Sequence, residues 1–251
     1  MPALRSNIDW KRWGKDDPLY GVTNWPNKQK GGPTAWTDDE LYALGESDWH
    51  DFFRQWQQYG VNRESCIEIG CGVGRITKQL VLAFNHVCAV DVSEDMTRYA
   101  STRIKAENVE FSIVDGVDLP QADCSVKSAF SSYVLQQFDN TDIGLLCFRE
   151  ILRVLDFGGT MMVQVPLYQW PTDDRLAFTK LLKTLYSLRL QASTMRAEVK
   201  RLAGMNARRD THFPMRLLRR ALMDVGYKGI EFRFFPASSD GSLQSFVLAT
   251  K

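Results

Sequence analysis

Short apolar segments alternate with helical patterns over residues 65–166, and this alternation constrains the fold more than any other feature of the chain. Each apolar segment has the length of a buried strand, and most of the stretches between them can hold one helix. Such repeats are typical of βαβ units, in which helices cover both faces of a parallel sheet. The expected strands span residues 65–70, 86–92, 109–115, 125–132 and 160–166, and the expected helices span residues 73–84, 93–106 and 140–155.

The C-terminal part adds one helix and two strands to this pattern. Residues 213–227 have helical spacing, and residues 229–236 and 243–250 have the character of strands. A short turn over residues 238–241 joins the two strands, which are close enough to pair as an antiparallel hairpin. The sequence therefore predicts an α/β fold with a seven-stranded, mostly parallel sheet that ends in an antiparallel hairpin.

The N-terminal segment differs in character, because six of the seven tryptophans lie in the first 56 residues. Thr37 and Glu40 have the spacing of a helix capping box, and the aromatic residues from Trp49 to Trp56 recur at helical spacing, which favours packing on the domain. We therefore expect residues 1–59 to form a Trp-rich helical arm or lid beside a domain of residues 60–251.

A second attachment interrupts the alternation at residues 167–212, where a mostly helical insertion is expected. It contains nine basic and four acidic residues. The positive charge is compatible with an acceptor that carries a carboxylate or phosphate, and also with a solvated helix face. Its leucines favour packing on the domain or on another subunit, so a homodimer through the arm or through the insertion is a candidate assembly.

Composition excludes several classes of protein. The chain has 31 basic and 30 acidic residues and a formal net charge of +1, so no global field attracts nucleic acid. No apolar run reaches the roughly 18 residues of a membrane span, and the first residues lack the apolar stretch of a signal peptide. Five widely spaced cysteines fit buried free thiols, no metal cluster is apparent, and we expect a cytoplasmic protein.

The strongest local motif is IEIGCGVGRIT at residues 67–77. Gly70, Gly72 and Gly74 remove Cβ atoms where a strand turns into a helix, so that backbone can approach a ligand. The G-x-G-x-G spacing differs from the dinucleotide fingerprint, and a pyrophosphate is therefore not the expected ligand. Asp91 ends the next strand, where a carboxylate can accept hydrogen bonds from ribose hydroxyls, and Asp115 follows the third strand, where it can bind the amine of an adenine.

These positions resemble the Rossmann-like, class I S-adenosylmethionine-dependent methyltransferases, and the resemblance covers residues 60–251. EIGCGVG resembles the first motif of the family, DVSEDM the acidic motif of the second strand, VDGVDLP the adenine loop, SSYVLQQF the fourth-strand motif and REILRVLDFGG the motif before strand five. The resemblance implies a Rossmann-like fold and S-adenosylmethionine as cofactor, with no metal. It implies the following cofactor-binding residues: Glu68, Gly70, Gly72, Gly74, Asp91, Val92, Met96, Asp115, Gly116, Val117, Ser132 and Tyr133.

The resemblance also implies a role for each group of these residues. Glu68 and the three glycines surround the methionine part of the cofactor, and Asp91 holds the ribose hydroxyls. Val92 and Met96 pack near the adenine, whose edge is held by Asp115 with Gly116 and Val117 beside it. Ser132 and Tyr133 face the sulfonium and the entering acceptor.

The general base is less well defined by the sequence. Gln137 stands where these enzymes often have a histidine, and an amide cannot act as a base. His212 is the best histidine candidate for catalysis, together with Tyr133, although a single loop histidine is more often solvated or a cap. The tetrapeptide motif D/N-P-P-Y/F is absent, which argues against modification of adenine N6.

The early aromatic residues have two interpretations. Trp10, Trp13, Tyr20 or Trp25 either close over the cofactor or acceptor, or they anchor the arm to the domain without touching a ligand.

We therefore expect an enzyme of class EC 2.1.1, an S-adenosylmethionine-dependent methyltransferase that acts on O, N or C of a small molecule. The alternatives are a protein or peptide N-methyltransferase and a non-catalytic module that binds S-adenosylmethionine.

Overall fold

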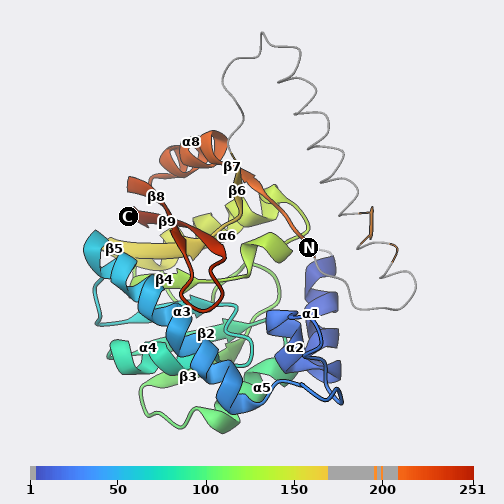
Figure 1. Cartoon of the computed structure of the whole chain (residues 1–251). Coiled ribbons are helices and arrows are strands. Elements are labelled where there is room, and N and C mark those ends of the chain that lie inside the picture. The colour runs from blue at the N-terminus through green and yellow to red at the C-terminus, as the bar shows by residue number, and fades with distance from the viewer. Residues whose placement is uncertain (1–3, 169–194, 197–198, 200–208) are drawn as a thin grey trace.

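The computed structural model describes residues 4–168, 195–196, 199 and 209–251. Seven strands form one sheet in the order β3-β2-β1-β4-β5-β9-β8 (Figure 1). Their bounds are β1 Cys66–Ile69, β2 Val87–Asp91, β3 Val109–Ile113, β4 Val126–Ser131, β5 Leu155–Gln164, β8 Lys228–Pro236 and β9 Leu243–Thr250. The first five are parallel, while β9 pairs antiparallel with both β5 and β8. The predicted α/β fold and its C-terminal hairpin are confirmed.

Helices cover both faces of this sheet. Their bounds are α1 Arg5–Asp16, α2 Pro18–Thr23, α3 Asp38–Tyr59, α4 Thr77–Ala83, α5 Glu94–Arg103, α6 Thr141–Val154 and α8 Met215–Val225, with a short 3₁₀ turn η1 at Leu135–Gln137. Residues of α3 and α4 pack on one face of the sheet, and residues of α6 and α8 pack on the other. This is the two-sided cover expected for a parallel sheet.

Helix α3 is the part of the N-terminal segment that belongs to the core. Its start carries the predicted capping box, because the Glu40 N–H donates to Thr37 Oγ1 and the Thr37 N–H donates to Glu40. Phe52 and Trp56 are fully buried, and Trp56 Nε1 donates to Thr160 Oγ1 at 3.1 Å. The aromatic residues at helical spacing therefore pack on the sheet, as predicted.

Two predicted boundaries are wrong. Strand β5 begins at Leu155, directly after α6, and Gly158 and Gly159 lie inside it. The backbone bends there, since Gly158 has φ +75° and the pairing of β4 with β5 shifts register between Val126 and Ser128. A Cβ on Gly159 would lie 2.9 Å from the Lys127 carbonyl oxygen, so this bend leaves no room for a side chain. Helix α4 begins only at Thr77, because the preceding glycines adopt left-handed conformations.

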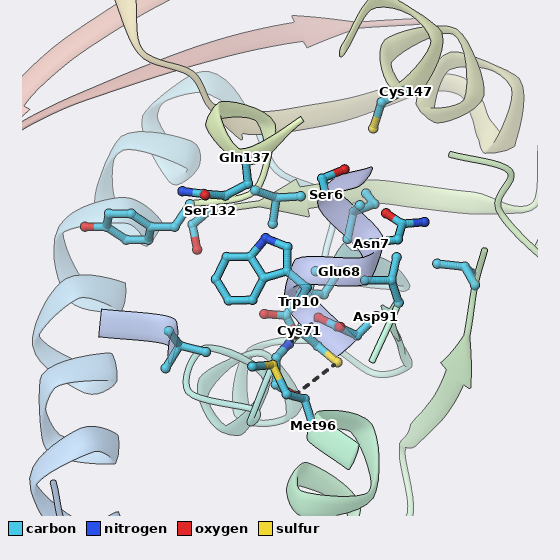
Figure 2. Close-up of a pocket in the computed structure, with 18 of the residues that line it drawn as sticks. Ser6, Asn7, Trp10, Glu68, Cys71, Asp91, Met96, Ser132, Gln137 and Cys147 are labelled. Carbon is cyan, nitrogen blue, oxygen red and sulfur yellow. Dashed lines mark hydrogen bonds between the residues drawn. The ribbon is translucent and has the colours of Figure 1, made fainter. Parts of the chain in front are cut away.

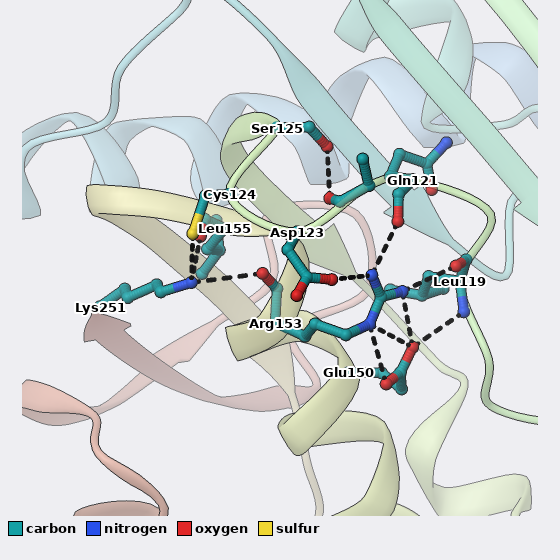
Figure 3. A network of polar contacts seen from close by, with 10 residues as sticks. Leu119, Gln121, Asp123, Cys124, Ser125, Glu150, Arg153, Leu155 and Lys251 are labelled. Carbon is teal, nitrogen blue, oxygen red and sulfur yellow. Dashed lines mark hydrogen bonds and ion pairs between the residues drawn. The ribbon is translucent and has the colours of Figure 1, made fainter.

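The motif before β5 anchors the loop between β3 and β4 (Figure 3). Arg153 of α6 donates to the Leu119 carbonyl oxygen at 2.8 Å and to Asp123 Oδ1 at 2.7 Å. Glu150 accepts from the Leu119 N–H at 3.2 Å and is paired with Arg153 at 2.9 Å. The loop is thereby fixed against α6, and Leu119 is one of the residues that line the pocket described below.

The structure of the insertion differs from the predicted helix at its first residues. Its first residues form β6 (Leu167–Tyr168), which pairs in parallel with β7 (Phe213–Pro214), so the segment begins as a strand rather than a helix. This pairing brings the two ends of the insertion together. Most of its interior, including Trp170 and the leucines from 176 to 188, lies outside the described residues. Within the described part of the chain, no helix is long and apolar enough to cross a membrane.

Candidate functional site

A pocket opens at the carboxyl ends of β1, β2 and β4 and is covered by α1 (Figure 2). We call it the glycine pocket. In a parallel sheet, loops at this edge form the usual ligand site. The described residues that line it are Ser6, Asn7, Trp10, Val22, Glu68, Ile69, Gly70, Cys71, Gly72, Val73, Arg75, Ile76, Asp91, Val92, Met96, Val114, Gly116, Val117, Leu119, Ser132, Tyr133, Val134, Gln137, Phe138 and Cys147.

The glycines after β1 have two different tasks. Gly70 has φ +77°, and a Cβ there would lie 2.1 Å from Val134 Cγ2, so this position leaves no room for a side chain. The Gly72 N–H donates to Asp91 Oδ2 at 2.8 Å. Gly74 does not line the pocket, because its missing Cβ faces Ile104 of the α5 end at 2.5 Å. Gly74 thus serves the packing of the loop on the domain.

Two buried carboxylates meet this loop. Burial raises the pKa of Glu68 to about 7, although Thr77 Oγ1 donates to it at 2.6 Å. Burial also raises the pKa of Asp91, against hydrogen bonds from the backbone of Ser93 and Gly72. A carboxylate that already accepts two backbone N–H bonds still has lone pairs for hydroxyl donors. Both residues line the pocket, as do the predicted Val92, which directly follows β2, and Met96 of α5.

The adenine side of the prediction is only partly reflected in the structure. Gly116 and Val117 line the pocket, whereas Asp115 does not. The Asp115 side chain is 70% exposed and lies 3.5 Å from Lys11 Nζ. Asn7 Nδ2 of α1 donates to Asp115 Oδ1 at 3.4 Å, so this carboxylate contacts α1, whose Asn7 lines the pocket in its place.

Ser132 and Tyr133 line the pocket at the end of β4. Tyr133 has φ +61°, an uncommon conformation for a residue with a bulky side chain. Its N–H donates to Gln164 Oε1 at 2.7 Å, and Gln164 in turn donates to Gln244. Burial raises the pKa of the Tyr133 phenol to about 12, and the Arg75 guanidinium lies 5.5 Å from the ring centre. The phenol is therefore neutral near pH 7.

Helix α1 closes the pocket. Of the α1 residues that line it, the sequence singled out Trp10 but not Ser6 or Asn7. Figure 2 shows the Trp10 ring between Ser132 and Gln137 on one side and Asp91 and Met96 on the other. Among the lining residues outside the predicted set, Ser6 and Asn7 contribute polar side chains and Arg75 contributes a positive charge. Arg75 is the one cation among the described residues that line the pocket, and its place in GVGRIT was the available signal.

Ionic contacts hold α1 in this position. Asp139 accepts from the Arg5 N–H at 2.9 Å and from the Ser6 N–H at 3.0 Å, which satisfies the start of the helix. Arg209 Nη1 lies 2.7 Å from Asp9 Oδ2, and Arg209 Nε lies 3.1 Å from Asp139 Oδ1. The arm is thus joined both to the loop after β4 and to the end of the insertion.

A second pocket, the polar pocket, adjoins the first. The described residues that line it are Val22, Thr23, Trp25, Leu44, Asp48, Arg75, Tyr133, Gln136, Gln137, Ser239, Asp240 and Ser242. Four of these residues also line the glycine pocket: Val22, Arg75, Tyr133 and Gln137. The two pockets therefore share one wall. This wall contains Tyr133, which follows Ser132 at the end of β4.

The early aromatic residues divide between the two interpretations. Trp10 lines the glycine pocket and Trp25 lines the polar pocket. Trp13 and Tyr20 line neither of them and contact each other, with 5.7 Å between ring centres.

The histidines lie apart from these pockets. His212 is half-buried, and its Nδ1 lies 2.9 Å from the Asp210 carbonyl oxygen. His50 is exposed on α3. His86 Nε2 lies 3.4 Å from Cys88 Sγ, and Glu110 of β3 joins them within 4.8 Å, a cluster that the sequence did not reveal. All three are absent from the described lining of both pockets, so neither His212 nor another histidine adjoins Tyr133 there.

The strand order and the glycine loop at the ends of β1 and β2 define the Rossmann-like fold of the class I methyltransferases. A family model for a methyltransferase domain matches residues 66–159. Residues 66–159 are thus a methyltransferase domain, and the fold around them is that of the class I S-adenosylmethionine-dependent methyltransferases.

Curated relatives agree with this family. A demethylmenaquinone methyltransferase of Porphyromonas gingivalis is 26% identical over 123 residues, which are 44% of this chain and 49% of that protein. A demethylmenaquinone methyltransferase of Clavibacter sepedonicus is 32% identical over 101 residues, or 40% of each chain. The matched part spans less than half the length of these relatives.

Solved structures share the fold. An S-adenosylmethionine-dependent methyltransferase of Methanosarcina mazei has a TM-score of 0.57 at 17% identity, covering 78% of this chain and 96% of that one. The magnesium protoporphyrin IX methyltransferase of Synechocystis, solved with bound SAH, has a TM-score of 0.56 at 16% identity, covering 97% and 93%.

Proposed function

We propose that the chain transfers the methyl group of S-adenosylmethionine to a small-molecule acceptor. The observation that carries this proposal is the pair of adjoining pockets, one lined by the glycine loop and Asp91 and one polar, with Tyr133 in their common wall. The glycine pocket would hold the cofactor, and the polar pocket would hold the acceptor. Methyl transfer needs the acceptor atom close to the methyl carbon and in line with its bond to sulfur.

The residues present fit the cofactor. Gly70 and Gly72 line the pocket, Asp91 can accept from ribose hydroxyls, and Ser6 Oγ is buried without a hydrogen-bond partner among the described residues. Arg75 can pair with the carboxylate of the methionine part, and Glu68 can accept from its amine. When bound, S-adenosylmethionine supplies a methyl group activated by the sulfonium charge.

The roles of the other groups follow from their position. The Tyr133 phenol, neutral near pH 7, can donate to or accept from an acceptor without carrying charge. Within the predicted arm of residues 1–59, α3 belongs to the core, and we assign the role of a lid to α1 and α2. Helix α1 contributes Ser6, Asn7 and Trp10 to the wall, and the closed lid excludes water from the transfer. The five free cysteines fit the reducing cytoplasm that we propose as its compartment.

The test measures binding and turnover separately. Calorimetry with S-adenosylhomocysteine should show binding to one site, and the chain should form S-adenosylhomocysteine from S-adenosylmethionine when an acceptor is supplied. Asp91→Asn should weaken binding, whereas Tyr133→Phe should keep binding and change turnover. Absence of S-adenosylhomocysteine binding would overturn the proposal. Binding by wild type without methyl transfer to any acceptor would favour a non-catalytic module.

A further inference from the structure

The polar pocket contains few groups that could take a proton from an acceptor. Asp48 is buried, and its two oxygens are already engaged, one by Arg75 Nη1 and the other by Ser239 Oγ at 2.5 Å. Gln136 and Gln137 are amides and cannot act as bases. Among the described lining residues there is no histidine or lysine. Asp240 is the one remaining carboxylate, and it is exposed.

This inventory separates the classes of acceptor. An aliphatic hydroxyl is a weak nucleophile at neutral pH and needs a base within hydrogen-bond reach. An amine needs none during the transfer, because its neutral form already carries a nucleophilic lone pair. The described lining therefore suits nitrogen better than an aliphatic oxygen.

The charge of the lining favours the same class. Two carboxylates, Asp48 and Asp240, face one guanidinium, Arg75, so the described lining carries one excess negative charge. Asp240 Oδ1 accepts from the Ser242 N–H at 2.8 Å, which fixes this carboxylate on the β8–β9 turn. Trp25 and Tyr133 add aromatic rings, whose faces attract cations. A carboxylate-bearing acceptor would find only Arg75, which is paired with Asp48 and is assigned above to the carboxylate of the cofactor.

We propose that the polar pocket binds a small basic amine and that the reaction is an N-methylation, with Asp240 as the specificity-determining carboxylate at the pocket entrance. This inference rests on the proposed function above. The acceptor arrives as an ammonium ion attracted by Asp240, loses one proton to water, and presents its lone pair beside Tyr133 and Gln137.

The step is balanced within the two substrates. The nitrogen lone pair forms a bond to the methyl carbon while the bond from that carbon to sulfur breaks. The electron pair of the broken bond goes to sulfur and gives S-adenosylhomocysteine. The positive charge passes from sulfur to the methylated ammonium ion, which Asp240 stabilises and which can later release its proton to water.

The experiment compares acceptors matched in size with the full chain. Two series are offered with S-adenosylmethionine: phenethylamine, 2-phenylethanol and phenylacetate, and butylamine, butanol and butyrate. S-adenosylhomocysteine is quantified, and calorimetry measures binding of each probe to the chain loaded with S-adenosylhomocysteine. We expect each amine to exceed its matched alcohol and acid by about tenfold or more in binding or in turnover. A glycine-serine hexapeptide with a free N-terminus and its acetylated twin form a further arm.

A variant pair tests the assigned carboxylate. Asp240→Asn keeps the turn, since an amide oxygen can still accept from Ser242, and it should raise the apparent KM or Kd for the amine about tenfold with the cofactor KM unchanged. Asp224→Asn removes an exposed carboxylate on α8, outside the described lining of both pockets, and should change neither value.

The outcomes separate the two proposals. Amines that are no better than their matched alcohols and acids, or equal effects of the two variants, would overturn the amine inference and leave the methyltransferase proposal intact. Preference for the free hexapeptide over every small amine would support an amine acceptor but replace the small molecule with a peptide. Lack of S-adenosylhomocysteine binding by wild type would overturn both.

Discussion

The ion pair between Asp9 and Arg209 makes the role of the arm testable. Both side chains are almost fully buried, with 2% and 6% exposure, and their charged atoms lie 2.7 Å apart. Removing one partner from a buried pair leaves the other charge uncompensated and typically costs about 3–5 kcal/mol. In Asp9→Ala, Arg209 keeps its contact with Asp139 at 3.1 Å, so we expect the lower end of this range, about 3 kcal/mol.

That loss falls on the docking of α1, which supplies part of the wall of the glycine pocket. If the cofactor binds only under a closed arm, the free energy of cofactor binding weakens by up to the same amount, about 3 kcal/mol. At 1.4 kcal/mol per factor of ten, this corresponds to about a 100-fold higher Kd. We expect Asp9→Ala to weaken S-adenosylhomocysteine binding by about 10- to 100-fold. The control is Asp16→Ala, which removes an exposed carboxylate from the same helix.

Two measurements decide the outcome. Calorimetry gives the S-adenosylhomocysteine Kd of wild type and both variants, and limited proteolysis followed by mass spectrometry reports cleavage within residues 5–23. Faster cleavage of the arm in Asp9→Ala with an unchanged Kd would refute the lid, because the arm would then open without consequence for the cofactor. An unchanged cleavage rate would refute the assigned strength of the ion pair.

Three further predictions concern the glycine pocket itself. Asp91→Asn should weaken S-adenosylhomocysteine binding by about 10- to 100-fold in calorimetry, since hydrogen bonds to a charged group contribute about 1.5–3 kcal/mol each, and the exposed Glu94→Gln should not. Because the pKa of Glu68 rises from 4.5 to about 7 on folding, the unfolded chain binds fewer protons between these values, and the stability of the ligand-free protein should fall by up to about 3 kcal/mol as the pH rises through this window. Urea unfolding at pH 5 and pH 8 should show this loss in wild type and not in Glu68→Gln, and parallel behaviour of the two would contradict it. Gly70→Ala should lose more stability than Gly60→Ala in denaturant titrations, because both have positive φ but only Gly70 has Val134 within 4 Å; equal losses would count against the steric argument.

The sequence predicted most of the sheet and many of the residues that line the glycine pocket because these depend on local patterns. Alternating apolar strands gave the parallel core, and the hairpin turn gave the antiparallel end. Gly70, Gly72 and Asp91 follow from their place at strand ends, where chain direction alone brings them to one edge of the sheet.

Spacing could not distinguish residues that serve packing from residues that face the ligand. Gly74 continues the glycine motif, but its open side meets Ile104. Asp115 has the expected offset after β3, but its orientation depends on α1, which places Asn7 and Lys11 beside it. His212 is a candidate because it follows the insertion, where the chain returns toward the strand ends, but its placement depends on the pairing of β6 with β7.

The arm contacts show why the closed site could not be predicted. Asp9 and Arg209 lie 200 residues apart, and no local pattern relates one helix carboxylate to one arginine among many. Arg75 was likewise read as part of a helix, whereas its pairing with Asp48 depends on how α3 crosses the glycine loop. Gly45 permits that crossing, because a Cβ there would lie 2.4 Å from the Arg75 carbonyl oxygen.

The common wall of the two pockets depends on the backbone of Tyr133 more than on its position in the sequence. A left-handed conformation costs a bulky residue of order 1–3 kcal/mol, which glycine would largely avoid. The chain instead has tyrosine there and holds its N–H with Gln164, which is itself bound to Gln244 of β9. The ring then lies beside Arg75, in the wall that the glycine pocket and the polar pocket share. The antiparallel strand β9, remote from every glycine-loop residue, thus supports the backbone of the residue in the common wall, and this residue would position the acceptor if the proposed function holds.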